Sequence, residues 1–228
     1  MDIFNTLGTW ENLAVVLAIA YLLLAIRENS YCWYAAFIST AIYTLLFWNV
    51  SLLMESALNV YYMGMAVYGW WQWQKGGAGH KGVNICRWPV TNHILLIMGI
   101  VLVSAISGLL LDVTTSAAWP YLDSFTTWAS VATTWMVARK ILENWLYWIV
   151  IDALSIVLYL DRGMEATALL FAGYVVIAGI AYLQWRKHYN QSDKTLNDTQ
   201  DAAACPERTA ATGNFTLASL GGCFYIEA

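Results

Sequence analysis

Seven apolar segments joined by short polar connections make up most of this chain, at residues 10–26, 31–48, 52–73, 90–111, 121–138, 144–160 and 164–185. A helix needs about 20 mostly apolar residues to cross the roughly 30 Å hydrocarbon core of a bilayer. Lipid offers the backbone no hydrogen-bond partners, so a spanning segment of this kind must be helical. The sequence therefore predicts an all-α membrane protein with seven transmembrane helices.

The composition agrees with this interpretation and narrows the function. Hydrophobic residues make up 60% of the 228 residues and charged residues 11%, whereas an average soluble domain has about 25% charged residues. The basic residues do not form a patch, which argues against nucleic-acid binding. None of the three histidines and four cysteines has metal-ligand spacing or a buried catalytic partner. We therefore expect no enzyme activity, cofactor or metal.

Basic residues predict the orientation. In a seven-helix chain they fall on one side, with Arg162 alone on the other. By the positive-inside rule that side is cytoplasmic, the N-terminus is outside and the C-terminus is inside. The residues on the cytoplasmic side are Arg27, Lys75, Lys81, Arg87, Arg139, Lys140, Arg186 and Lys187.

Two matches indicate an internal repeat. Residues 72–75 (Gln-Trp-Gln-Lys) match residues 184–187 (Gln-Trp-Arg-Lys) 112 positions later, and Tyr62 then matches Tyr174. Glu-Asn followed by Trp recurs at 28–33 and 143–148, 115 positions apart. Two three-helix repeats separated by one helix run in the same direction through the membrane. We predict this 3-1-3 arrangement.

The predicted domain boundaries follow from these matches. Residues 1–188 form the transmembrane domain, with repeat one at 10–73, the linker helix at 90–111 and repeat two at 121–185. The chain turns polar at Tyr189, and we expect a cytoplasmic, disordered tail at 189–228.

The sixth predicted helix carries the main candidate residues. Asn144, Trp148 and Asp152 lie on one face, within about 80° of arc. A carboxylate inside a membrane helix is costly and indicates a substrate pathway, although a hydrogen bond between packed helices is the alternative. Glu143, beside Asn144 at the cytoplasmic edge, is expected to be solvated.

Polar and aromatic residues on three other helices complete the predicted substrate site. These are Asn59 and Tyr62 on the third helix, Thr127 on the fifth and Tyr174 on the seventh. Aromatic rings attract cations, and amides and hydroxyls bind hydroxyl groups, so this set suits a flat, cationic, hydroxylated ligand such as a nucleoside with a charged base. Sugars and neutral rings remain alternatives.

Four runs of residues resemble the PnuC family of vitamin transporters: 122–124 (Leu-Asp-Ser), 139–140 (Arg-Lys), 143–148 (Glu-Asn-Trp-Leu-Tyr-Trp), and 68–71 (Tyr-Gly-Trp-Trp) with Trp73. The resemblance covers about residues 10–187. It implies a fold similar to the sugar-transporting SWEET proteins, in the inner membrane of a bacterium. It also implies facilitated diffusion of an unphosphorylated vitamin, which a cytoplasmic kinase then traps.

Nicotinamide riboside is the vitamin we expect, because its ring is cationic and its ribose suits Asn144 and Asp152. Thiamine and riboflavin, which relatives of the family carry, are alternatives, as is proton-coupled transport through Asp152. A membrane receptor or a membrane enzyme is less expected. The expected partners are the substrate, the lipid bilayer and, through function, the kinase; homo-oligomer formation is left open.

Overall fold

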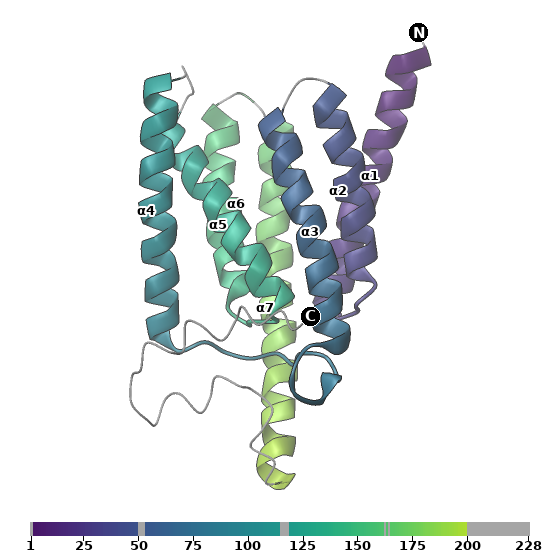
Figure 1. Cartoon of the computed structure of the whole chain (residues 1–228), viewed down its shortest axis with the longest axis vertical. Helices are drawn as coiled ribbons and strands as arrows, with labels where there is room; N and C mark the ends of the chain where they lie inside the picture. The colour runs from purple at the N-terminus through teal and green to yellow at the C-terminus, as the bar shows by residue number, and fades with distance from the viewer. Residues whose placement is uncertain (1, 50–52, 115–118, 162, 164, 200–228) are drawn as a thin grey trace, which may run out of the picture.

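The computed structural model describes residues 2–49, 53–114, 119–161, 163 and 165–199. Within these residues seven α-helices run side by side (Figure 1), which confirms the predicted all-α fold with seven helices. Each predicted span corresponds to one helix, and the predicted and observed bounds differ by several residues at some helix ends. The helices are α1 (Asp2–Ile26), α2 (Cys32–Asn49), α3 (Leu53–Lys75), α4 (Val90–Thr114), α5 (Pro120–Ala138), α6 (Asn144–Asp161) and α7 (Glu165–Thr199).

The described helices carry the apolar surface that a bilayer requires. Three stretches are long and apolar enough to cross a membrane: Val90–Thr114, Asn144–Asp161 and Ala168–Ser192. Trp10–Ile26 is also apolar but shorter. On α4, large apolar side chains such as Leu102 and Val113 are exposed, as expected for a helix that faces lipid.

We call α1, α2 and α3 the first group of helices and α5, α6 and α7 the second, and α4 lies at one side of the molecule (Figure 1). In the first group α2 contacts both α1 and α3, and in the second α6 contacts both α5 and α7. The groups meet where α3 contacts α5 and where α1 contacts α7, while α4 packs on α5. Each group thus has a central helix, and the two outer helices reach across to the other group.

Tryptophan pairs recur in the two groups with nearly identical geometry. The rings of Trp33 and Trp73 meet edge to face, with centroids 5.3 Å apart and an interplanar angle of 85°. The rings of Trp145 and Trp185 do the same at 5.4 Å and 88°. Each member of the second pair lies 112 positions after its counterpart. Edge-to-face contact is a favoured geometry for buried aromatic rings.

The same tryptophans link the two groups. The Trp73 indole N–H donates to the carbonyl of Val137 at the end of α5, at 3.2 Å. The Trp185 indole N–H donates to the carbonyl of Ala25 at the end of α1, also at 3.2 Å. Donors and acceptors are each 112 positions apart. The first bond has its donor in the first group and its acceptor in the second, and the second bond has the reverse arrangement.

The turns after α1 and α5 also correspond at 112 positions. Glu28 and Lys140 both have left-handed backbones, with φ of 55° and 51°. Their amides donate to Ala25 and Val137 at 3.0 Å in each case. The predicted correspondence of 115 positions is therefore wrong, because it paired Trp33 with Trp148 whereas the turn geometry pairs Trp33 with Trp145.

The seventh helix continues beyond the predicted domain boundary. We predicted a disordered tail from Tyr189, but α7 remains helical to Thr199. The residues from 189 to 199 contain no glycine or proline, so nothing in this stretch breaks the helix. The rest of the predicted tail, 200–228, lies outside the described residues.

Close packing of α2 against α3 gives a test of the fold. A Cβ added at Gly69 would overlap the ring of Trp33, whereas one added at Gly64 on the same helix would meet nothing within 4 Å. We expect Gly69→Ala to destabilise the protein by about 1–3 kcal/mol, because Trp33 must move. Gly64→Ala should be neutral or stabilising by up to about 1 kcal/mol, because alanine favours the helix.

Thermal unfolding of both variants in the same detergent is the measurement. Equal melting temperatures for Gly69→Ala and Gly64→Ala would contradict the packing of Trp33 against α3.

Candidate functional site

Asp152 lies near the middle of α6, the central helix of the second group. Its residue is only 6% exposed, because α6 is packed between α5 and α7. Its carboxyl lies within electrostatic range of the Tyr174 hydroxyl on α7. Tyr174 in turn lies within electrostatic range of Tyr43 on α2. The predicted residues Asp152 and Tyr174 thus lie on two packed helices within range of each other's charge, and Tyr43, which no sequence pattern singled out, lies within range of Tyr174.

An aromatic row continues from Tyr174 along the interface of α6 and α7. The ring of Phe171 meets that of Tyr174 at 5.6 Å with an interplanar angle of 72°. The ring of Tyr159 lies 5.1 Å from that of Phe171. Tyr159 shares the helix face of Asp152, so these rings and the carboxyl group lie at one helix interface.

The predicted residues of α3 lie in the first group of helices. Tyr62 is half-buried, its ring lies 5.6 Å from that of Tyr61, and its hydroxyl lies within electrostatic range of Tyr21 on α1. Asn59 is buried one turn earlier on α3. The Tyr61 hydroxyl donates to the Val131 carbonyl at 2.9 Å and so attaches α3 to α5. The α3 residues therefore face a part of the interior built from α1, α3 and α5.

The remaining predicted residues lie on α5 and along α6. Asn144 is fully buried, and its amide N–H donates to the Ile141 carbonyl at 2.6 Å. Trp148 is half-buried and packs against two separate clusters of buried hydrophobic side chains. Thr127 is half-buried on α5. Eight residues along a helix span about 12 Å, so Asn144 and Asp152 lie at different depths. They form a ladder along α6 and do not meet at one point.

Several buried polar atoms have no hydrogen-bond partner among the described residues. These include the side-chain oxygen of Asn144 and the indole N–H groups of Trp33 and Trp145. The two indoles are counterparts in the two groups, 112 positions apart. Unpaired buried polar groups cost free energy unless a ligand or water satisfies them. Periodicity alone did not distinguish these tryptophans from the interfacial ones.

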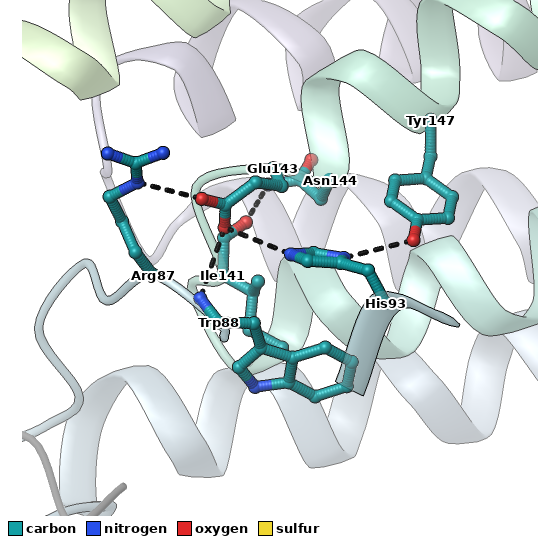
Figure 2. Close-up of polar contacts among 7 residues, drawn as sticks. All are labelled: Arg87, Trp88, His93, Ile141, Glu143, Asn144 and Tyr147. Carbon is teal, nitrogen blue, oxygen red and sulfur yellow. Dashed lines mark hydrogen bonds and ion pairs between the residues drawn. The ribbon is translucent and has the colours of Figure 1, made fainter. Parts of the chain in front are cut away.

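Glu143 is buried, contrary to the expectation that it is solvated (Figure 2). The Arg87 Nε–H donates to one carboxylate oxygen at 2.9 Å, and the Trp88 backbone N–H donates to the other at 3.4 Å. The His93 Nε2 atom lies 3.9 Å from that second oxygen. The bond to Glu143 raises the pKa of Arg87 above its usual range.

The cluster around Glu143 attaches the linker between α3 and α4 to the start of α6. His93 Nδ1 lies 3.0 Å from the Tyr147 hydroxyl (Figure 2). The linker residue Cys86 also exchanges backbone hydrogen bonds with the turn before α6, to Lys140 and from Leu142. The sequence analysis missed this because the partners are more than 50 residues apart. Glu143 is therefore a structural group and not part of the ladder.

The surface pockets do not coincide with the predicted site. One, of about 370 Å³, is lined by Leu183, Arg186 and neighbouring residues of α7. Another, of about 400 Å³, lies beside Trp119 and Asp112. Within the described part of the chain, no group of three or more His, Cys, Asp or Glu side chains could hold a metal ion. The site is thus defined by the buried side chains between the helices.

A family model described as "Nicotinamide mononucleotide transporter" matches residues 8–187. The chain belongs to this family. The matched members of this family are transporters. Membership in the PnuC family, which the sequence resemblance predicted, is confirmed.

Curated relatives and a solved structure agree with the family. The nicotinamide riboside transporter PnuC of Escherichia coli is 23% identical over 183 residues, which cover 69% of this chain and 75% of that protein. The riboflavin/roseoflavin transporter RibM of Streptomyces davaonensis is 23% identical over 175 residues, 75% of this chain and 78% of that one. A crystal structure of the vitamin B3 transporter PnuC is similar with a TM-score of 0.62 at 21% identity, covering 81% of this chain and 83% of that one.

The attachment of the linker by Glu143 can be tested by proteolysis. Glu143→Ala removes a charged hydrogen-bond acceptor worth about 1.5–3 kcal/mol. We therefore expect trypsin to cut the linker at Lys81 and Arg87 roughly ten times faster, because local opening becomes easier. Glu165→Ala, at an exposed residue of α7, is the control and should leave the rate unchanged. Equal cutting of both variants would show that Glu143 does not hold the linker.

Proposed function

We propose that this protein carries nicotinamide riboside across the bacterial inner membrane by facilitated diffusion, and that a cytoplasmic kinase traps the product. The observation that carries the proposal is the Asp152 carboxyl, buried within α6 where this helix packs against α5 and α7, in a chain with the fold of this transporter family. The relative from Escherichia coli is named as a nicotinamide riboside transporter. The ligand follows from the chemistry of the site.

Asp152 has no counter-charge among the described residues. In the part of the chain that the structure describes, the ion pairs are made by Glu28 and Glu143, and Asp152 takes part in none of them. A buried carboxylate without a partner is strongly unfavourable. A cationic ring supplies the missing charge when it enters. Nicotinamide riboside carries a positively charged pyridinium ring, whereas riboflavin is neutral.

The other residues of the proposed site have distinct roles. Trp148, Tyr62 and Tyr174 stack on the ring or on the edge of the sugar, and Tyr43 closes the side of α2. Polar side chains at successive depths contact the ligand in turn as it passes along α6. A ribose hydroxyl that reaches Asn144 satisfies its side-chain oxygen, which has no hydrogen-bond partner among the described residues. The residues that provide these polar contacts are Asn59, Thr127, Asn144 and Asp152.

We infer that the helices form a 3-1-3 arrangement similar to the SWEET fold, with halves at 10–73 and 121–185 and a linker helix at 90–111. The contacts that recur 112 positions apart support this. The membrane domain is then 1–188, with seven spans and the basic ends of the helices in the cytoplasm. The N-terminus lies outside.

Riboflavin is the second candidate ligand, because a relative of similar identity is named as a riboflavin/roseoflavin transporter. Thiamine, which is cationic, is a third. Aromatic side chains stack with all three vitamins, so only the carboxylate of Asp152 separates the cationic ligands from riboflavin. Proton-coupled transport through Asp152 is the alternative mechanism.

Replacing Asp152 tests its role directly. Asp152→Asn keeps the size of the side chain and removes its charge. A hydrogen bond to a charged group contributes about 1.5–3 kcal/mol, so we expect the affinity for nicotinamide riboside to fall about 10- to 100-fold. Isothermal titration of the purified protein measures this. Undiminished affinity in Asp152→Asn would exclude Asp152 as the ligand's counter-charge.

Titration of the unmodified protein with all three vitamins decides the ligand. We expect saturable binding of nicotinamide riboside, weaker binding of thiamine, which lacks a ribose for the polar contacts, and weaker binding of riboflavin, which lacks the positive charge. Preferential binding of riboflavin would favour a protein like RibM, and binding of thiamine alone would equally contradict the proposed ligand.

A further inference from the structure

An ion pair joins the two groups of helices at their basic end. The Lys140 ammonium in the turn after α5 lies 3.1 Å from a carboxylate oxygen of Glu28 in the turn after α1. The side chains are only 10% and 20% exposed, respectively. The two residues are counterparts, 112 positions apart, with the same left-handed backbone. The pair therefore lies where the two halves of the molecule meet.

Two further helices contribute to the same cluster. The Lys140 ammonium lies 4.7 Å from the centre of the Trp73 ring on α3, a cation–π distance. The second carboxylate oxygen of Glu28 lies 2.7 Å from Nδ1 of His188 on α7. The ends of α1, α3, α5 and α7 thus converge on one buried pair of charges.

The indole bonds of Trp73 and Trp185 flank this pair. Both run from one half to the other and end on the last turns of α5 and α1, three residues before Lys140 and Glu28. Together they close the space between the halves at this end. A carrier must open each end of its pathway in turn, and these contacts cannot persist when this end opens.

A buried ion pair is suited to such a switch. Desolvation offsets much of its attraction, so it adds little net stability when formed, but removing one partner leaves an uncompensated buried charge. The pair therefore affects the relative populations of the open and closed conformations more than the free energy of unfolding. Reversing one charge places two like charges in the closed end and opposes closure.

We propose that Glu28 and Lys140 form the inner gate of the transport pathway, which opens when the two halves separate at this ion pair. This inference rests on the proposed transport function and on the orientation that the basic residues predict. It adds the residues that control release of the substrate into the cytoplasm.

A native thiol reports on this gate. Cys32 begins α2 four residues after Glu28, is completely buried, and lies within electrostatic range of Lys140. Replacing the other three cysteines, Cys86, Cys205 and Cys223, with serine leaves Cys32 as the one thiol in the chain. Only opening of the inner end exposes it to a reagent from the cytoplasm.

The experiment measures the rate at which a membrane-impermeant maleimide labels Cys32 in inside-out vesicles. Lys140→Glu should label at least about ten times faster than the parent, because like charges shift the population toward the open state. Combining it with Glu28→Lys should return the rate to within about twofold of the parent. In the variant with both charges exchanged, the lysine at position 28 can make the cation–π contact with Trp185, because Trp185 is the counterpart of Trp73.

A matched control separates a gate from a general loss of packing. Arg87→Glu breaks another ion pair with a buried carboxylate, that of Glu143, which does not join the two halves. It should leave the labelling of Cys32 unchanged. Equal rates in Lys140→Glu and the parent, or acceleration by Arg87→Glu as large as by Lys140→Glu, would overturn the gate.

The ligand is tested separately in the same vesicles by uptake of nicotinamide riboside. If the parent carries nicotinamide riboside and Cys32 does not respond to the charge reversal, the gate is wrong and the transport function stands. If Cys32 responds and reverts as expected but no nicotinamide riboside moves, the gate is supported and the proposed ligand is wrong.

Discussion

Two hydrogen bonds from tryptophan indoles to backbone carbonyls connect the two groups of helices. Trp73 reaches α5 and Trp185 reaches α1, with the same length of 3.2 Å and a spacing of 112 residues between counterparts. Each carbonyl belongs to the last turn of a helix and also accepts the backbone N–H of the turn residue three positions later, Lys140 or Glu28. A carbonyl oxygen has two lone pairs, so the indole N–H bonds to the second one. The two links thus join the same helix turns that carry the ion pair between Glu28 and Lys140.

The membrane also explains which polar groups are structural. Glu143 is buried and bonds to an arginine and a backbone amide, whereas Glu28 is half-buried and contacts a lysine and a histidine. Both carboxylates lie in the turns at the basic ends of the helices and hold the chain together there. Asp152 differs, since it is buried within a helix and forms no ion pair with a described residue. A carboxyl group inside a membrane helix without an ion pair supports the proposed cationic ligand, which would supply the missing charge.

Much of the fold could be predicted from the sequence, because lipid requires long apolar segments and these are easy to see. The offset of 112 positions, predicted from the ends of the third and seventh helices, agrees with the recurring contacts of Trp73 and Trp185. The offset of 115 positions predicted for the second and sixth helices was wrong, because the Glu-Asn-Trp pattern at 28 and 143 is a match of residue types, whereas the turn backbone aligns Glu28 with Lys140. A short pattern does not reveal which residues have a left-handed backbone.

The site was predicted less completely than the fold. Helical periodicity selected Asp152 and Tyr174, which lie on the packed helices α6 and α7, with Asp152 buried. It could not select Tyr43 or indicate that Glu143 is buried, because both depend on contacts between helices far apart in the sequence. The length of α7 was also underestimated, since a polar composition lowers hydropathy without breaking a helix.

Transport by purified protein in liposomes tests the central claim most directly. Labelled nicotinamide riboside should equilibrate across the liposome membrane down its own gradient, with no proton or sodium gradient imposed, and unlabelled nicotinamide riboside inside should accelerate entry of the label. Absence of flux without an ion gradient, together with uptake when a proton gradient is imposed, would contradict facilitated diffusion and favour coupling through Asp152.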